Sequence, residues 1–478
     1  MQERGRTFGG RARRLLAAGG LSLLLGMIGC QWIAGLRARP PIVLVVIDTL
    51  RADHLGLYGY KRPTSPRLDA WSKGAAVFDR AFSASPWTLT SFGSIYTGLL
   101  PSRHGAGVLV SPTDASAGRT VAGSMVLLGS PKSFGGLDPS VPTLPETLAA
   151  KGYATAAVID NPFLHPLFGI ARGFQSYDYV PGGNESIRRA DVVVDKALSW
   201  VEAHRAQPFF LMVHFIDPHM NYDAPPPFRG RFTGGIASRV SLPVRDARLI
   251  RQLAPTLPAA DRAFITAAYD EEIAFVDDQV GRLLEGLGKL GVPQHGLIVI
   301  TADHGEELFD HDGFEHGHSV YDELLHVPLL IEGKGVRPGR RQAAVSLVDV
   351  APTVLAAAGL PVPEGIAGVS LWPALTTGAT VPQRDLFAER LLYGKEQKAV
   401  IHWPYKLILG PDDGEQRLFN LLEDAGEHND RAIAEPAEAR SLAQEAERVF
   451  AAANVAPPPT AAIDSATREK LRALGYGD

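Results

Sequence analysis

The segment Ile42-Val-Leu-Val-Val-Ile47, followed directly by Asp48-Thr49-Leu50-Arg51, has the length and composition of a buried β-strand that ends in a carboxylate. A second apolar run, Leu297-Ile-Val-Ile300, is followed closely by Asp303-His304-Gly305-Glu306. In an open sheet covered by helices, ligands bind beyond the carboxyl ends of the strands. Carboxylates and an imidazole at two such ends predict a divalent metal held by Asp48, Asp303 and His304.

Strand-length apolar runs alternate with segments of helical periodicity along the body of the chain. Further strand candidates are 155–159 and 208–215, and helix candidates are 186–205, 261–290 and 347–358. This alternation predicts an α/β fold, with a central, mostly parallel sheet sandwiched by helices. The stretches 111–140 and 223–260 lack a clear period, and we expect them to be irregular loops at the mouth of the site.

The pattern changes after residue 365. Short strand-like pieces at 385–389, 405–409 and 417–420 lie between turn residues, and helical segments follow from 434 onward. We therefore expect a catalytic domain over residues 40–365 and a small C-terminal α+β subdomain, with antiparallel strands, over 366–478.

The N-terminal segment has the pattern of a secretion signal. Five arginines precede an apolar stretch from Leu15 to Ile28, which ends in Met27-Ile-Gly-Cys30. This end resembles a bacterial lipoprotein box, so we expect a signal peptide over residues 1–29 and lipidation of Cys30. The alternative is an uncleaved membrane anchor over residues 15–36, whose 22 mostly apolar residues are close to the length that spans a bilayer. Both readings predict an extracytoplasmic protein tethered to a membrane, on the periplasmic face of a bacterial envelope.

Charge and cysteine content exclude two properties. The net charge is −5, and because residues 1–29 carry five Arg and one Glu, the remainder is −9. Such a chain is unsuited to bind nucleic acid through phosphate contacts. Cys30 is the only cysteine, so an intrachain disulfide is excluded.

Several motifs resemble the sulfatase branch of the alkaline-phosphatase superfamily. They are Asp48-Thr-Leu-Arg-Ala-Asp-His-Leu-Gly56, Asp303-His-Gly-Glu306, His326-Val-Pro-Leu-Leu-Ile331, Val348-Asp-Val-Ala-Pro-Thr-Val-Leu355 and Lys470-Leu-Arg-Ala-Leu-Gly-Tyr476. The resemblance covers nearly all of residues 40–478. It implies an alkaline-phosphatase-like fold and a metal-dependent hydrolase or group transferase acting on an anionic ester.

The block from Pro86 to Gly98 is similar to the sulfatase block that begins Cys-x-Pro-Ser-Arg and ends in Thr-Gly. In this alignment Thr88 stands at the cysteine that sulfatases oxidise to formylglycine, and Phe92 stands at the arginine. Threonine cannot yield that aldehyde, because its β-carbon also carries a methyl group. Thr88 instead resembles the nucleophile of the superfamily's phosphoryl-transfer branches. A helix predicted over 90–96 would place Thr88 at its positive end.

The resemblance also suggests roles for other residues. Asp48, Thr88, Asp303 and His304 match metal-ligand positions. His219 matches a catalytic histidine that contacts the ester. His316 and His318 lie where sulfatases place a substrate-binding lysine, and either could instead complete a second metal site. Asp217 could join His219 in such a site, and Arg51 could line the substrate pocket.

The expected metal is Mn²⁺ or Zn²⁺, with Ca²⁺ possible. Thr49 stands where many sulfatases have a second aspartate, so one calcium ligand of that branch is lost.

Three functions compete on this evidence. The leading one is cleavage or transfer of a phosphate ester through Thr88. The others are sulfuric ester hydrolysis without formylglycine and a non-catalytic binding protein that retains the fold.

Overall fold

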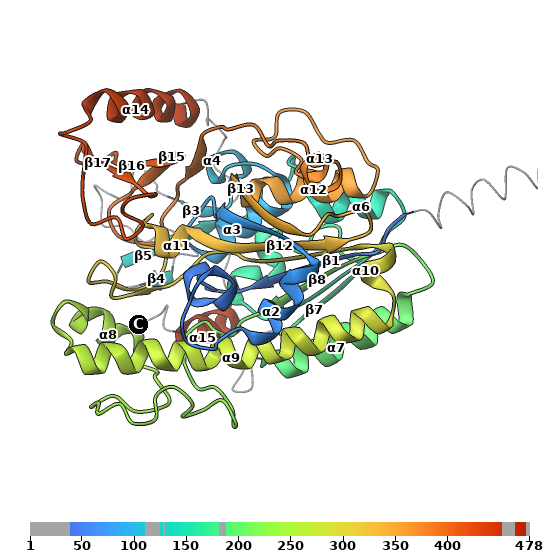
Figure 1. The fold of residues 1–478 in the computed structure, drawn as a ribbon, viewed down its shortest axis with the longest axis horizontal. Coiled ribbons are helices and arrows are strands. Elements are labelled where there is room, and N and C mark those ends of the chain that lie inside the picture. Colours follow the sequence, from blue (N-terminus) through green and yellow to red (C-terminus); the bar gives the residue numbers. More distant parts are fainter. Residues whose placement is uncertain (1–38, 110–124, 128–129, 181–187, 452–463, 475–478) are drawn as a thin grey trace, which may run out of the picture.

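The computed structural model describes residues 39–109, 125–127, 130–180, 188–451 and 464–474. The predicted signal peptide and Cys30 lie outside these residues. A central eight-stranded sheet has the order β13-β2-β12-β9-β1-β8-β6-β7 (Figure 1). Its strands are β1 (Ile42–Ile47), β2 (Ala76–Phe82), β6 (Ala154–Ile159), β7 (Ser176–Tyr179), β8 (Phe209–Phe215), β9 (Leu297–Ala302), β12 (His326–Gly333) and β13 (Gly339–Ser346). Within this sheet β12 runs antiparallel to its neighbours and the other strands run in one direction, which confirms the predicted mostly parallel sheet.

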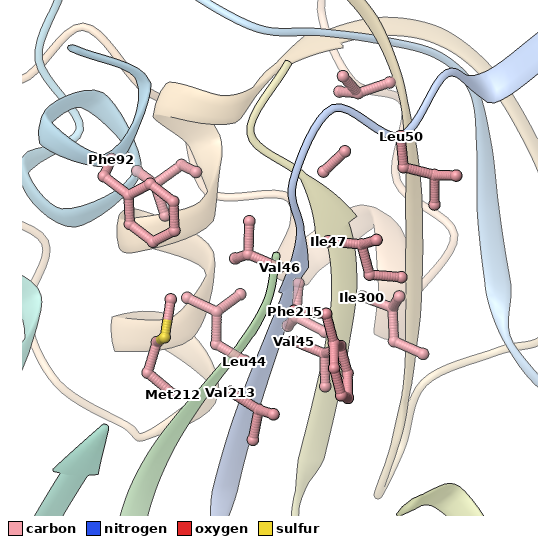
Figure 2. Packing of buried hydrophobic residues seen from close by; sticks show 14 of the residues in the cluster. Leu44, Val45, Val46, Ile47, Leu50, Phe92, Met212, Val213, Phe215 and Ile300 are labelled. Carbon is pink, nitrogen blue, oxygen red and sulfur yellow. The ribbon is translucent and has the colours of Figure 1, made fainter. Parts of the chain in front are cut away.

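Strand β1 lies inside the sheet, between β8 and β9, and every one of its side chains is buried. Burial on both faces requires a helical layer on each side. Figure 1 shows α2, α7 and α9 on one side of the sheet and α3, α6, α12 and α13 on the other. In the close view of Figure 2, Phe92 of α3 packs beside Val46 and Met212, so the helix that begins at Thr88 is anchored in the core.

Four of the described helices before residue 365 fall on segments predicted to be helical, namely α3 (Thr88–Thr97), α7 (Ala190–His204), α9 (Ala259–Lys289) and α12 (Val350–Ala357). The sequence did not predict the shorter helices α2 (Pro66–Trp71), α4 (Pro101–His104), α6 (Leu144–Ala150), α10 (Val292–His295), α11 (Asp322–Leu325) and α13 (Trp372–Thr376). Helix α9 begins before Asp261, whose carboxylate accepts hydrogen bonds from Arg239 N and Ser238 Oγ. Asp261 therefore lies inside this helix and does not cap it.

The two stretches expected to be irregular contain regular structure. The first holds β4 (Met125–Leu127) and β5 (Ser130–Gly135), which join β3 (Gly107–Leu109) in a small antiparallel sheet. The second holds α8 (Ala247–Leu253), and its turn near residue 230 is fixed by Glu271 of α9, which accepts hydrogen bonds from the backbone of Gly230, Phe232 and Thr233. These elements depend on contacts distant in sequence, which local periodicity does not reveal.

The C-terminal part contains a four-stranded antiparallel sheet with its own small core under a helix. The elements are β14 (Leu386–Ala388), β15 (Lys398–His402), β16 (Tyr405–Gly410), β17 (Glu415–Asn420) and α14 (Pro436–Ala451). The sequence did not predict β15. Leu375 of α13 and Leu471 of α15 (Ser465–Ala473) pack into the main core. The domain division at residue 365 stays a prediction.

Candidate active site

The ends of β1 and β9 and the start of α3 bring four predicted residues together. Asp48 directly follows β1, Asp303 and His304 follow β9, and Thr88 is the first residue of α3. His304 Nε2 lies 3.3 Å from Thr88 Oγ1, 3.6 Å from Asp48 Oδ1 and 3.5 Å from Asp303 Oδ2. All four side chains are fully buried.

The donor set of Asp48, Asp303 and His304 fits a divalent cation. Asp48 Oδ1 and Asp303 Oδ2 are buried and accept no hydrogen bond from the described residues. His304 Nδ1–H donates to Gly305 O at 2.8 Å, so the Nε2 lone pair faces the two carboxylates. One ligand atom from each of the three residues lies within 4.8 Å of the others. Carboxylate oxygens and an imidazole nitrogen are ligands that divalent metal ions take in proteins.

The pKa shifts of the two aspartates also fit a cation between them. Burial and the nearby Asp48 carboxylate raise the pKa of Asp303 well above its usual range. Burial acts on Asp48 in the same direction, but His214, His219 and His304 outweigh it and lower the pKa of Asp48. When two carboxyl groups lie close together in a buried site, ionising both has a high free-energy cost unless a cation lies between them.

A strained turn aims Asp48 into the site. Thr49 has a positive φ of 56°, which is rare for a β-branched residue. Tyr269 of α9 holds this conformation, because its hydroxyl donates to Thr49 O at 2.7 Å and accepts from Arg51 N at 3.1 Å. Strain of this kind persists only where the surroundings fix it and is concentrated at functional sites.

The position of Thr88 follows from how α3 is anchored. Trp87 is the residue that precedes the helix, and its indole Nε1–H donates to Arg390 O at 2.7 Å. Ser91 Oγ donates to Asp303 O at 2.7 Å, which ties the first turn of α3 to the end of β9. Thr88 is thus not the N-cap, and its hydroxyl points toward His304.

Sequence reasoning missed Asn161, which lies just beyond β6. Its Nδ2 donates to Asp48 Oδ2 at 2.6 Å and to Thr88 Oγ1 at 3.4 Å. Its Oδ1 accepts from Phe163 N at 2.9 Å, and this contact fixes the orientation of the amide. Because Asp160-Asn161 follows an apolar run that was recognised as a strand, the same strand-end rule could have found it.

His214 is a second residue that the sequence did not single out. It lies on β8 opposite Val46, and its Nε2 is 3.3 Å from Asp48 Oδ2. Its side chain is fully buried. It therefore supports the negative charge of Asp48 from inside the sheet.

His219 and His316 lie beside the four-residue cluster. The rings of His304 and His316 are 4.4 Å apart, and those of His316 and His219 are 5.0 Å apart. His316 Nδ1 lies 2.8 Å from Glu306 Oε1, and burial raises the pKa of Glu306 to about 7. Burial lowers the pKa of both histidines. The structure thus brings these two predicted residues to the site.

Arg51 and His318 are held by other groups. The Arg51 guanidinium donates to Asp53, Asp310 and Glu306 O, which uses all five of its N–H donors. This geometry leaves no donor for a substrate and does not support the predicted role. His318 Nε2 bonds Glu307 Oε2 at 2.6 Å, and its Nδ1 lies 3.2 Å from Tyr393 Oη, so both ring nitrogens already have partners.

The suggested second metal site is not assembled around His219. Asp217 Oδ2 accepts a hydrogen bond from Ala190 N at 2.9 Å and so caps α7. A second set of side chains has ligand atoms close enough together to hold a metal ion, namely Glu307, His311 and Glu323. Their polar atoms already bond one another and the backbone, as in the 2.9 Å contact of His311 Nδ1 with Glu323 Oε1.

His104 packs against α3 and is held there as a neutral ring. Its Nδ1 accepts from Ala106 N at 3.2 Å and its Nε2 lies 3.1 Å from Thr90 O, so the neutral ring is the one that fits. A side chain at Gly93 would overlap this imidazole. Burial, together with Arg390, lowers the pKa of His104 to about 3.

We expect the free energy of unfolding to fall as the pH drops below about 6.5. In this range His104 binds a proton in the unfolded chain but stays neutral in the folded protein. Between pH 6.5 and 5 the loss is about 2 kcal/mol. Urea denaturation of the wild type and His104→Gln at both pH values measures it. An equal pH dependence in the two proteins would contradict this assignment.

The comparisons with known proteins agree with this geometry. The family model described as Sulfatase matches residues 40–360. The chain belongs to the sulfatase family. Arylsulfatase K of Xenopus laevis is 24% identical over 76% of this chain and 73% of its own length. An arylsulfatase of Clostridium perfringens is 23% identical over 81% of this chain and 89% of its own length.

A crystal structure of the phosphonate monoester hydrolase of Agrobacterium radiobacter has a similar fold. It superposes with a TM-score of 0.65 at 20% identity and covers 87% of this chain and 96% of that one. The alkaline-phosphatase-like fold and the ester-hydrolase class predicted from sequence are therefore confirmed. Among the helices that the structure describes, none is both long enough and apolar enough to cross a membrane.

Proposed function

We propose that this sulfatase-family protein transfers or hydrolyses a phosphate ester with Thr88 as the nucleophile. The observation that carries this proposal is the 3.3 Å distance between Thr88 Oγ1 and His304 Nε2, at the position where sulfatases carry the residue that is oxidised. A threonine hydroxyl cannot become an aldehyde, so it must attack directly, and it needs activation to do so.

The surroundings of Thr88 supply that activation. A divalent cation held by Asp48, Asp303 and His304, Mn²⁺ or Zn²⁺ by donor type, would favour ionisation of the hydroxyl and neutralise charge on the ester. The N-terminus of α3 adds backbone N–H donors for the substrate oxygens. Asn161 Nδ2 donates to Thr88 Oγ1 at 3.4 Å and so helps to hold this oxygen in place.

The reaction would proceed in two steps. In the first step Thr88 Oγ1 gives up its proton and forms a bond to phosphorus, while the ester oxygen leaves with the electron pair and takes up a proton. In the second step a water or an acceptor alcohol gives up a proton and attacks that phosphorus, and Thr88 Oγ1 leaves with the electron pair and regains a proton. His219 Nδ1 lies 2.6 Å from Met220 O, and this contact orients its ring beside that of His316. With a pKa lowered by burial, His219 is suited to take the proton from the incoming water or alcohol.

Phosphate esters are favoured over sulfate esters because the oxidised residue is absent. Similarity in fold to a phosphonate monoester hydrolase supports a phosphorus substrate as well. Since both substrates are tetrahedral oxyanions, slow sulfate-ester turnover is the second candidate. His316, beside His304 and His219, is placed to contact a substrate oxygen.

Acid-quenched mass spectrometry tests this proposal. The metal-loaded protein is mixed with an aryl phosphate monoester, an aryl phosphate diester or an aryl sulfate, quenched at low pH and digested. We expect the peptide that contains Thr88 to carry a phosphate from the monoester or an aryl phosphate from the diester. Turnover without any modified Thr88 would overturn the mechanism, and metal binding without turnover would favour a binding protein.

We also propose an extracytoplasmic, membrane-tethered location through a lipid on Cys30. The support is the arginine-rich, apolar N-terminal pattern, which lies outside the described residues. Expressed in a bacterium, Cys30→Ala should lose the lipid-modified N-terminal peptide in a mass spectrum and leave an unprocessed chain. A mature wild-type chain that still carries residues 1–29 would favour the uncleaved anchor.

A further inference from the structure

Helix α15 packs on the main domain, far from the C-terminal sheet and α14 (Figure 1). Its Leu471 and Leu474 are buried in the main core. The Asp464 carboxylate accepts from Thr467 N at 2.7 Å and caps its first turn. The helix also contacts the short 3-10 helix Pro162–Leu164, which directly follows Asn161.

Lys470 of α15 places a buried positive charge between this helix and the loop that follows β6. Its side chain is fully buried and forms an ion pair with Asp160, whose side chain is also fully buried. Lys470 Nζ donates to Val180 O at 2.9 Å and lies 4.8 Å from the centroid of the Tyr179 ring. Asp160 also accepts a hydrogen bond from Arg188 N. Burying both charges is unfavourable unless they are well paired, so the pair fixes a single arrangement of the two segments.

Asp160 is the neighbour of Asn161, the residue whose amide reaches Asp48 and Thr88. The 2.9 Å bond between Asn161 Oδ1 and Phe163 N joins the amide to the same 3-10 helix that α15 contacts. Helix α15 therefore holds the loop of residues 160–164 on both sides of Asn161.

We propose that α15 is a positioning element of the active site, in which the Lys470–Asp160 pair holds the Asn161 amide against Thr88 and Asp48. Lys470 is a positioning residue, because it contacts neither Thr88 nor the metal-binding side chains. The role in turnover rests on the proposed function of Thr88. The role in ordering the loop stands on the contacts alone.

The test compares Lys470→Met with Arg472→Met. Both remove one positive charge from α15, but Arg472 is exposed. For Lys470→Met we expect kcat per active site to fall by about 10–100-fold with KM within about threefold, the range seen when partners of ligating residues are removed. Active sites are counted by the phosphorylated Thr88 peptide. Arg472→Met should match the wild type.

A second readout does not depend on turnover. In the metal-free protein, amide hydrogen exchange in peptides covering residues 160–168 should be faster in Lys470→Met and unchanged in Arg472→Met. If the single variant does not fold, Asp160→Asn/Lys470→Met removes both buried charges together and should fold. It should show the same lower kcat and the same faster exchange.

The inference would be overturned if folded Lys470→Met or Asp160→Asn/Lys470→Met showed the same kcat per active site and the same amide exchange rate as the wild type. A loss of activity that only tracks the folded fraction, with kcat per site unchanged, would reduce Lys470 to a structural role and overturn it too. If no phosphorylated Thr88 is found in the wild-type protein, the proposed function is wrong instead. The exchange experiment would then still decide whether α15 orders the Asn161 loop.

Discussion

Replacing Thr88 by alanine is expected to lower kcat on the best phosphate ester by at least about 10³-fold, as removal of a covalent nucleophile does in other enzymes. The alanine variant keeps Asp48, Asp303 and His304, so it should still bind substrate, and KM should change little. The loss should appear in kcat alone, because the missing oxygen acts only when the bond to phosphorus forms.

Thr88→Ser is the matched control. It retains a hydroxyl at the first position of α3 and should keep kcat within about tenfold of the wild type, while Thr88→Val, which keeps the shape, should behave as alanine. Steady-state kinetics of all three variants, each with its metal content measured, separates loss of the nucleophile from loss of metal. An alanine variant within about tenfold of the wild type would require water to attack the ester directly.

The parts of this site that sequence could predict are those fixed by local pattern. Asp48 and Asp303 end apolar strands that periodicity identifies, and parallel strands place their carboxyl ends at one edge of the sheet. The β1–β9 pairing aligns Ile47 with Ala302, so the two aspartates meet as the strand-end rule requires.

The parts that sequence could not predict depend on side-chain partners distant in the chain. Arg51 lies just beyond a strand end, where a substrate-binding side chain is expected. Its guanidinium instead donates hydrogen bonds to Asp310, which is distant in sequence. His318 has a favourable local context and is engaged by Glu307 and Tyr393. Lys470 and Asp160 are 310 residues apart and meet only in the folded chain. Whether a polar side chain is free for chemistry is decided by such contacts, and no periodicity encodes them.

Removing the divalent cation is expected to abolish turnover and to destabilise the protein. A cation at 1,000 times its Kd stabilises a folded protein by about 4 kcal/mol. Without it, the unpartnered oxygens Asp48 Oδ1 and Asp303 Oδ2 remain close together in a dry site. Thermal unfolding midpoints after chelation, and after return of Zn²⁺ or Mn²⁺, measure the difference.

Asp303→Asn makes this prediction specific, because it removes one of the two facing charges and weakens the metal site at the same time. Metal-free Asp303→Asn should unfold at a higher temperature than the metal-free wild type, whereas with metal the order should reverse. The difference in unfolding temperature between the metal-free variant and the metal-free wild type should also become smaller toward low pH. The pKa of Asp303 is raised in the fold, so its folded carboxyl keeps a proton that the unfolded one has lost, and stability falls as the pH rises through that range. If the metal-free variant is the less stable one at pH 7, the facing carboxylates do not destabilise the metal-free protein, and the prediction is wrong.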